Sequence, residues 1–417
     1  MKLLDNKIPR GVIYHKVLES IRYWITSFFF PLNDQNLIRK FESKFAEYCG
    51  REYCAAFPFA RTAIYYALKN RNFPKGSEVI LPPITIKGIV DVVLALDLIP
   101  VYVDLDIDTL NFQLDDLDKK VTSRTRAVII TPLFGLVPDM KSLSTYFRAR
   151  GIFIIEDFSQ CLNGLFDGQR IGTFGDVGIY SASSIKTLDT LGGGLAITND
   201  PVLHEGLKES QAGLYPADRR FLIKKAWINL VRNVATTKLV FSAVVFPLLQ
   251  IIRKFNPGMT LKQTGSRNKD RVPKLPRVWF TGYSSFQAAI GLAHMDGVCA
   301  NDRVRVRNAE FVKSNSSLDK FPATTSSSRN VYWQLIAVVE DPLKVQEHLA
   351  AYGIDSATSS LELVSALEKY PNKTRTPMAE RIYHNGIFIP CFPGLSDNDL
   401  ARIVNATNLL DSTATGQ

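Results

Sequence analysis

Short apolar runs alternate with longer stretches of mixed polarity through the first half of the chain. Each short run is rich in β-branched residues and is bounded by polar or turn-forming residues, which indicates a buried strand. Strands are predicted at 78–81, 99–103, 127–131 and 153–155, and helices at 35–50, 61–70, 86–96 and 139–150. This alternation predicts an α/β fold with a mostly parallel sheet that helices cover on both faces.

The pattern after residue 303 predicts a smaller α/β domain. A long helix at 285–297 precedes it, and its own elements are a strand at 331–339, a helix at 343–352, a strand near 387–390 and a last helix capped by Ser396. With 417 residues, the chain is long enough for one large and one small domain. We expect an N-terminal helix in 1–34, a large domain in 35–210, an insertion in 211–277, and the long helix with the small domain in 278–417.

The most informative stretch is 151–200. Its first apolar run stops at Glu156-Asp157, so that an acid lies at the carboxyl end of a buried strand. A second strand is predicted at 177–180, and a serine-rich loop with one lysine, Lys186, separates it from the glycine cluster 192–194 and a third strand. A buried carboxylate, small hydroxyls and one lysine on loops between strands are the groups that a phosphorylated, electron-poor cofactor requires.

Pyridoxal phosphate (PLP) is such a cofactor. A lysine holds it as a Schiff base, and an aspartate against its pyridine nitrogen keeps that nitrogen protonated. Lys186 is the candidate lysine, Asp157 the candidate aspartate, and Ser181 with neighbouring backbone N–H groups the candidate phosphate site. Taken singly, each residue is also typical of an ordinary α/β core with a surface lysine and a capping serine.

Taken together, these residues resemble those of a known family. The order E-D-x-x-Q, G-x-x-G-D, S-x-x-x-x-K and a glycine cluster is similar to that of the DegT/DnrJ/StrS-type sugar aminotransferases. Further similar segments lie at 41–50, 73–85, 100–111, 127–140 and 282–296. The resemblance implies a fold-type-I, PLP-dependent transferase. It also implies the site residues, which are Lys186 as the Schiff-base lysine, Asp157 at the pyridinium, Gln160 near the ring hydroxyl and Ser181 at the phosphate.

Three positions depart from the family pattern. The usual S-G-T is Phe59-Ala60-Arg61 here, so that Arg61, next to Ala60, replaces a small hydroxyl residue beside the phosphate and could bind it bidentately. Ile86 stands where an aromatic residue commonly stacks on the cofactor ring. Gly282 stands where Asn or Arg commonly reaches across a dimer. These departures bear on the substrate and on contacts between subunits more than on PLP.

Positive charge is concentrated in 211–277. This segment has fourteen Lys or Arg and two acids, a balance of +12, whereas the whole chain has 50 − 40 = +10. Its apolar run 239–252 is too short to span a bilayer as a simple helix. An apolar face with basic flanks favours an interfacial or re-entrant element on an anionic membrane. A buried helix pair, a dimerisation arm and a nucleic-acid patch are the alternatives, and nucleic acid is the least favoured because the basic residues interleave with aliphatic runs.

Residues 12–32 predict an amphipathic helix that ends in an aromatic patch. Such a helix either packs on the core or on a partner subunit, or lies at a membrane interface, where Trp and Tyr are enriched. Together with 227–255 it is the predicted membrane contact. No signal peptide is expected, because residues 1–10 are polar. Five scattered cysteines indicate a reducing compartment and argue against disulfides or zinc, so no catalytic metal is expected.

We therefore expect a PLP-dependent aminotransferase. Its amino donor is expected to be glutamate or a similar amino acid, and its acceptor a keto-sugar that is nucleotide-linked, or lipid-linked and presented at a membrane. The resemblance also implies a homodimer. The expected location is the cytoplasm, with peripheral attachment to the inner face of the membrane as an option. A PLP-dependent dehydratase is one alternative, although related dehydratases lack the lysine; a membrane-associated, non-catalytic protein with a vestigial site is another.

Overall fold

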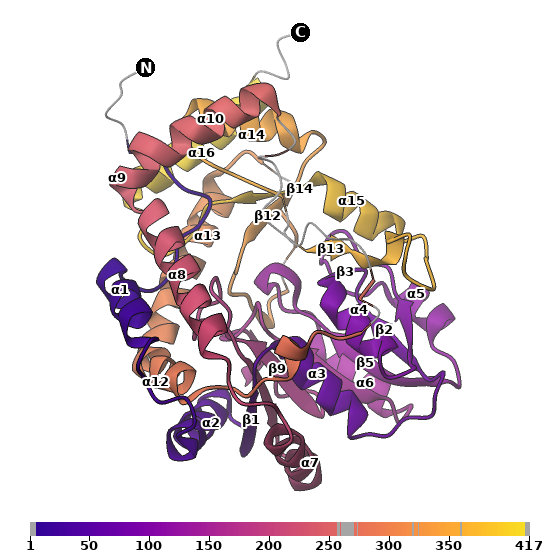
Figure 1. Cartoon of the computed structure of the whole chain (residues 1–417). Coiled ribbons are helices and arrows are strands. Elements are labelled where there is room, and N and C mark those ends of the chain that lie inside the picture. The colour runs from indigo at the N-terminus through magenta and orange to yellow at the C-terminus, as the bar shows by residue number, and fades with distance from the viewer. Residues whose placement is uncertain are drawn as a thin grey trace.

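The computed structural model describes residues 6–256, 259, 271–272, 274–318, 321–323, 325–358 and 361–412. A seven-stranded sheet forms the centre of the large domain, and a smaller domain built on two strands lies beside it (Figure 1). The chain therefore has the predicted α/β architecture of one large and one small domain.

The central sheet has the strand order β1-β10-β9-β6-β5-β2-β4. Its strands are β1 (Tyr53–Phe57), β2 (Glu78–Leu81), β4 (Ile99–Tyr102), β5 (Thr125–Ile130), β6 (Phe153–Asp157), β9 (Val177–Ser181) and β10 (Gly194–Thr198). The strands from β9 to β4 are parallel neighbours. Since β10 is antiparallel to both β9 and β1, β1 runs in the same direction as the parallel strands. The predicted mostly parallel sheet is confirmed.

Helices cover both faces of this sheet. Successive side chains of a strand point to opposite faces, so each strand contributes to two hydrophobic clusters. Cys54 and Ala56 belong to one hydrophobic cluster, whereas Ala55 and Phe57 belong to the other. The first cluster includes residues of α2 (Gln35–Cys49) and α6 (Met140–Arg148), and the second includes residues of α3 (Ala60–Lys69), α4 (Lys87–Leu94) and α7 (Pro201–Ala212). The predicted helices of this domain match these bounds to within a few residues.

The small domain follows helix α12 (Ser285–His294), which is shorter than the helix predicted at 285–297 because residues 295–297 form a 3-10 turn. Its elements are the antiparallel strands β12 (Leu335–Val338) and β14 (Gly386–Ile389) and the helices α13 (Val298–Asn315), α14 (Pro342–Ala351), α15 (Pro377–Asn385) and α16 (Asp397–Ser412). The shorter elements of the chain are α5 (Leu114–Lys120), β3 (Ile84–Thr85), β7 (Leu165–Phe166), β8 (Gln169–Arg170), β11 (Ser328–Arg329) and β13 (Glu362–Leu363).

The predicted strand at 331–339 is wrong in its first half. Residues 331–334 are irregular because they are hydrogen-bonded to a loop of the large domain instead of to a neighbouring strand. The N–H of Val331 donates to the carbonyl of Gly135 (3.0 Å), and the N–H of Gln334 donates to that of Phe134 (3.2 Å). These bonds tie the entry of the small domain to the large domain.

The described residues of the predicted insertion form three helices and a π-helical segment. They are α8 (Arg219–Ala235), α9 (Lys238–Val240), the π-helical residues Phe241–Val245, and α10 (Phe246–Phe255). The predicted boundary at 210 falls inside α7, which ends at Ala212. Within the described ranges, no single helix is long and apolar enough to cross a membrane. The pair Arg219–Ala235 and Lys238–Phe255, bent by 67°, passes that test together, by length and composition only.

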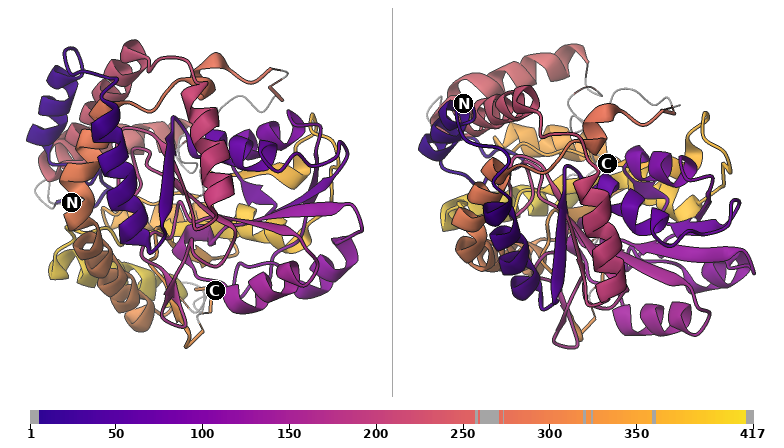
Figure 2. Two further views of the ribbon diagram at one scale, coloured as in Figure 1. Left: turned by 90° about the horizontal axis from the view of Figure 1, so that it is seen from below. Right: turned by 60° about the horizontal axis from the view of Figure 1, so that its bottom comes forward.

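The N-terminal helix α1 (Val17–Thr26) is shorter than the predicted helix at 12–32. The chain before it is drawn into the fold, because the ring of His15 is buried and its Nε2 lies 3.0 Å from the carbonyl oxygen of Asp189. Both views of Figure 2 show α1 beside α8. Tyr23 and Trp24 of α1 are half-buried and pack against a small cluster that contains Leu191, Ala226 and Phe286, so part of this helix belongs to the core.

Candidate active site

Four predicted site residues follow strands that end at the same edge of the sheet. Asp157 is the last residue of β6, and Ser181 is the last residue of β9. Ala60 begins α3 shortly after β1, and Ile86 precedes α4 shortly after β2. Because these four strands run in the same direction, their carboxyl ends bring the residues to one edge, where open α/β sheets bind ligands.

Lys186 lies on the loop between β9 and β10. Its backbone N–H donates to the carbonyl of Ser183 (2.9 Å), and its Nζ lies 3.5 Å from the centre of the Trp333 ring. The side chain is buried. Burial lowers the pKa of Lys186 to about 7; the carboxylate of Asp157 opposes this effect and the charge of Arg305 adds to it. A lysine that is neutral near neutral pH can attack an aldehyde.

Asp157 shares this environment with Lys186. Burial raises the pKa of Asp157, whereas hydrogen bonds from Ser159 and the charge of Lys186 act to lower it. The N–H of Ser159 donates to Asp157 Oδ1 (3.2 Å), and the N–H of Ser181 donates to Ser159 Oγ (2.9 Å). Ser159 therefore connects the ends of β6 and β9. A cationic ring nitrogen would supply a counter-charge to this buried carboxylate.

Gln160 holds the loop that follows β5. Its Oε1 accepts a hydrogen bond from the N–H of Phe134 (2.8 Å), and Phe134 has a φ of 57°, which is unfavourable for a bulky side chain. At the next residue, Gly135, an added Cβ would lie 2.6 Å from the backbone nitrogen of Trp333. Gln160 thus supports the loop against which Trp333 packs. Its predicted position near the ring hydroxyl of the cofactor stays a prediction.

The start of α3 and the end of β9 meet at Gly194. Gly194 pairs with Ser181 across the β9–β10 ladder, and an added Cβ would collide with Phe59 and Ala60. Phe59, the N-cap of α3, makes no side-chain capping bond. Since the first N–H groups of a helix have no partner within it, this end of α3 presents free donors and a positive dipole to an anion. Ser181 Oγ, which donates to Ser183 Oγ (3.3 Å), lies next to it.

The Arg61 side chain is sandwiched between two aromatic rings. Its guanidinium carbon lies 4.6 Å from the ring centre of Phe59 and 4.4 Å from that of Trp279, and its Nη1 lies close to Gly88 of α4. Burial lowers the pKa of Arg61 to about 10, although two nearby carboxylates oppose this effect. Its buried Nε has no hydrogen-bond partner among the described residues, so one donor remains for a ligand. Bidentate phosphate binding by Arg61 stays a prediction.

Ile86 and Gly282 have contrasting environments. Ile86 is 36% exposed although its neighbours Thr85 and Lys87 are buried, and Ile185 beside Lys186 is 41% exposed. Exposed apolar side chains next to buried site residues are consistent with the wall of an open ligand site. Gly282 donates its N–H to the carbonyl of Tyr215 (2.6 Å) in the same chain. What Gly282 contacts across a dimer stays a prediction.

The residues that hold the Lys186 loop were not predicted from the sequence. Arg305, fully buried on α13, donates to Thr187 Oγ1 (3.2 Å) and to the carbonyl of Val331 (2.9 Å), and it pairs with Asp302. Trp333 Nε1 donates to the carbonyl of Ile185 (2.9 Å). An Asp and an Arg three residues apart on a helix are typical of an exposed ion pair, so their spacing did not indicate a buried role.

These residues fit PLP. Besides the amine, the carboxylate and the helix N-terminus, the buried polar atoms that lack a partner among the described residues include Thr131 Oγ1 directly after β5 and Gln334 Oε1 beside Trp333. Buried polar groups normally have a hydrogen-bond partner, so these two atoms are consistent with a polar ligand at the site. When bound, PLP supplies an exchangeable aldehyde and an electron-poor ring. Lys186 Nζ would then accept and return protons, Asp157 would hold the ring nitrogen protonated, and the start of α3 with Ser181 would hold the phosphate.

Comparison with known proteins agrees with this arrangement. The model of the DegT/DnrJ/EryC1/StrS aminotransferase family matches residues 31–224 and 260–408 and leaves out 225–259, which holds most of α8 and all of α9 and α10. Two solved structures are similar over nearly their full length. They are the sugar aminotransferase CalS13 from Micromonospora echinospora (21% identity, 96% of this chain, 99% of that chain, TM-score 0.72) and the PLP form of the putative sugar aminotransferase Spr1654 from Streptococcus pneumoniae (19%, 98%, 99%, 0.71).

Curated relatives extend the comparison to named activities. GDP-perosamine synthase of Escherichia coli O157:H7 is 25% identical over 380 residues, which is 89% of this chain and 90% of that protein. A dTDP-3-amino-3,6-dideoxy-alpha-D-galactopyranose transaminase of Aneurinibacillus thermoaerophilus is 35% identical over 168 residues, 40% of this chain and 46% of that protein. The chain belongs to the DegT/DnrJ/EryC1/StrS aminotransferase family, and it is a PLP-dependent aminotransferase of fold type I.

Proposed function

We propose that the protein transfers an amino group from an amino acid to the keto group of a nucleotide-linked sugar. The observation that carries this proposal is the joint burial of Lys186 and Asp157 at the carboxyl edge of the sheet. Both residues are needed for amino transfer, because the lysine moves protons and the aspartate keeps the cofactor ring cationic.

The relatives support the acceptor and the donor. GDP-perosamine synthase and the dTDP-linked transaminase both carry a nucleotide-linked amino sugar in their names. L-glutamine:2-deoxy-scyllo-inosose aminotransferase of Streptomyces kanamyceticus, 33% identical over 174 residues (42% of this chain and 41% of that protein), names glutamine as its donor. Glutamate, or its amide glutamine, is therefore the donor that we propose.

A lipid-linked keto-sugar is the second candidate acceptor. It is favoured by the exposed apolar residues on α1 and α10, such as Leu18 (79% exposed) and Phe255 (81% exposed), since a protein that lies on a membrane can meet a lipid-linked substrate there. The same residues favour peripheral attachment to the cytoplasmic face of a membrane. We also propose a homodimer, as the family resemblance implies, and light scattering measures it directly.

Two half-reactions test the function. The PLP-loaded protein is mixed with glutamate or glutamine, and conversion of the bound cofactor to its amino form is followed by loss of its yellow absorbance. The aminated enzyme is then offered GDP- or dTDP-linked keto-sugars and lipid-linked keto-sugars, and return of the yellow absorbance reports amino transfer. Lys186→Ala is the control, which should remain unable to react. A protein that accepts amino groups but returns them to none of these sugars would contradict the proposed acceptor class.

A further inference from the structure

Four neighbouring helices present an outer apolar face. We use this name for exposed apolar residues of these helices and of two short segments next to them. They are Leu18, Ile21 and Ile25 of α1, Phe28 and Phe29 directly after α1, Trp227 and Val231 of α8, Leu239 of α9, Val244 of the π-helical turn, and Leu248, Ile251, Ile252 and Phe255 of α10. Positions 248, 251, 252 and 255 recur at helical spacing within α10, as do 18, 21 and 25 within α1, so each set lies on one side of its helix. Contiguous exposed apolar surface of this kind marks an interaction site.

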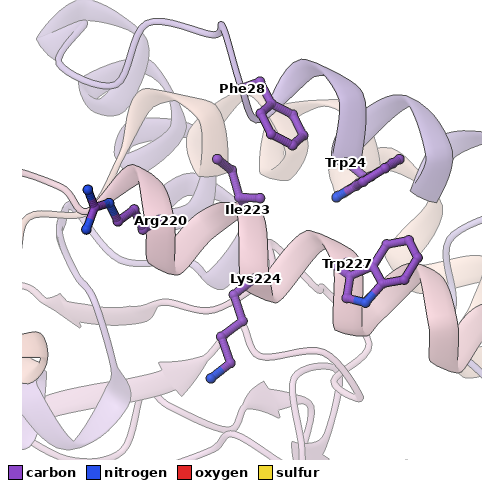
Figure 3. Close-up of a pocket in the computed structure, with 6 residues that line it drawn as sticks. All are labelled: Trp24, Phe28, Arg220, Ile223, Lys224 and Trp227. Carbon is purple, nitrogen blue, oxygen red and sulfur yellow. The ribbon is translucent and has the colours of Figure 1, made fainter.

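The face is continuous between α1 and α8. The rings of Trp24 and Trp227 lie 5.0 Å apart, centre to centre, across the two helices. Figure 3 shows Phe28, Ile223 and the two tryptophans around an open hollow between the helices, with Lys224 extending away from it. In Figure 1, α10 follows α9 at a bend of 67° from α8 and crosses the top of the molecule, where it lies over the small domain.

The opposite sides of these helices are already occupied. On α8, Ala226 packs with Leu191, and Asn229 Nδ2 lies 3.1 Å from His15 Nδ1. On α10, Arg253 is buried and its Nη2 donates to Asp355 Oδ1 (2.5 Å). The outer apolar face can therefore not be buried by a simple rotation of the helices. It needs a partner from outside the domain.

The positive charge around the outer apolar face indicates what kind of partner it binds. Residues 219–256 contain eight Lys or Arg and no Asp or Glu. Arg220, Lys224, Arg232, Lys238 and Lys254 among them are exposed. A two-fold interface made by this face would place the same cations against each other, because such an interface is self-complementary. An anionic lipid surface complements both the apolar residues and the cations.

We propose that the outer apolar face docks the protein on an anionic bilayer, with α1, α8 and α10 lying in the interface. Apolar side chains enter the boundary between headgroups and acyl chains, and the basic residues bind lipid phosphates. The helices lie on the bilayer and do not cross it, because Arg253 and Asn229 hold α10 and α8 to the rest of the protein. This proposal goes beyond the amino transfer reaction and does not depend on the identity of the sugar.

Vesicle binding tests the proposal with the full-length, PLP-loaded protein. We expect it to sediment with phosphatidylcholine vesicles that contain phosphatidylglycerol, and to be released as salt is raised. The double variant Leu248→Glu/Ile251→Glu should bind at least about tenfold more weakly, because it removes two inserted side chains and adds two negative charges. Val202→Glu, at a residue of α7 that is 77% exposed and outside the face, is the matched control and should bind like the wild type.

Tryptophan fluorescence gives an independent measurement. Trp227 is exposed and Trp24 is half-buried, and both line the open hollow between α1 and α8, whereas Trp279 and Trp333 are buried. Brominated acyl chains should therefore quench the wild type, and Trp227→Phe should lose a large part of that quenching. Absence of quenching, or equal binding of the double variant and the wild type, would overturn the proposal. So would a change in oligomeric mass of the double variant with unchanged vesicle binding, because the face would then be an interface between copies of this chain.

Discussion

Burial lowers the proton affinity of the Lys186 amine. The reaction of this amine with PLP should therefore depend on pH in a way that can be measured. The pKa of about 7 means that the reactive, neutral form grows as pH rises through 7 and is nearly complete at pH 9. The rate at which apoprotein turns yellow with PLP should therefore rise and then level off over this range. The same titration with Nα-acetyl-lysine corrects for protonation of PLP itself. A rate that keeps rising toward pH 10.5, the ordinary pKa of lysine, would show that burial does not shift this amine.

Asp157 has a role that differs from that of Lys186, and Asp157→Asn separates the two. The variant keeps Lys186 and the start of α3, so it should still bind PLP and turn yellow. It loses the negative charge that stabilises a protonated ring, so amino transfer from glutamate should slow by on the order of 10²-fold or more. Absorbance measures binding, and the glutamate half-reaction measures the rate. Equal rates in variant and wild type would remove Asp157 from the proposed role.

At the scale of elements, the glycine at the start of β10 controls the place of α3. Gly194→Ala adds a methyl group where Phe59 and Ala60 already lie, so the helix must move. We expect a loss of stability of about 1–3 kcal/mol and weaker PLP binding, since the shift opens the phosphate site. Gly297→Ala is the matched control: an added Cβ there has no neighbour within 4 Å, and we expect a change within about 0.5 kcal/mol. Urea unfolding and PLP titration measure both effects.

Helix α13 supports the Lys186 loop through a buried ion pair. Arg305→Met leaves Asp302 charged and buried without its partner, so the free energy of unfolding should fall by about 3–5 kcal/mol. The double variant Asp302→Asn/Arg305→Met removes both charges and should recover part of this loss. Urea unfolding of the apoproteins of the wild type, the two single variants and the double variant measures this double-mutant cycle. A double variant that loses the sum of both single effects would show that the two residues act independently.

At the scale of the whole molecule, sequence patterns predicted the strands, helices and site residues that are determined by residues close to them along the chain. The apolar runs that became β2, β5 and β6 are buried on both sides, so their composition alone identified them. Lys186 and Asp157 were found because a family motif holds them in one stretch. Trp333 and Arg305 were not found, because they reach the Lys186 loop from more than a hundred residues further along the chain. Contacts at that separation leave no periodic signal in the sequence.

The insertion connects both domains, since α8 covers the loop after Lys186 and α10 lies against α14 in the small domain. Asp355 holds α10 in place by accepting hydrogen bonds from Arg253 (2.5 Å) and Arg10 (2.6 Å). Arg253 is buried, and two of its nitrogens lack partners in the part of the chain that the structure describes, so Asp355→Asn leaves its charge uncompensated.

We therefore expect Asp355→Asn to release α10 while the PLP site remains intact. Amide hydrogen exchange in 246–255 should increase at least about tenfold, whereas exchange in 226–233 should change little, because α8 keeps its contacts with His15 and Leu191. Asp397→Asn, at a side chain that is 95% exposed and pairs only loosely with Arg307 (3.8 Å), is the control and should leave both segments unchanged. If α8 opens together with α10 in Asp355→Asn, the two helices form one cooperative unit, and anchoring of the insertion at two separate points would be wrong.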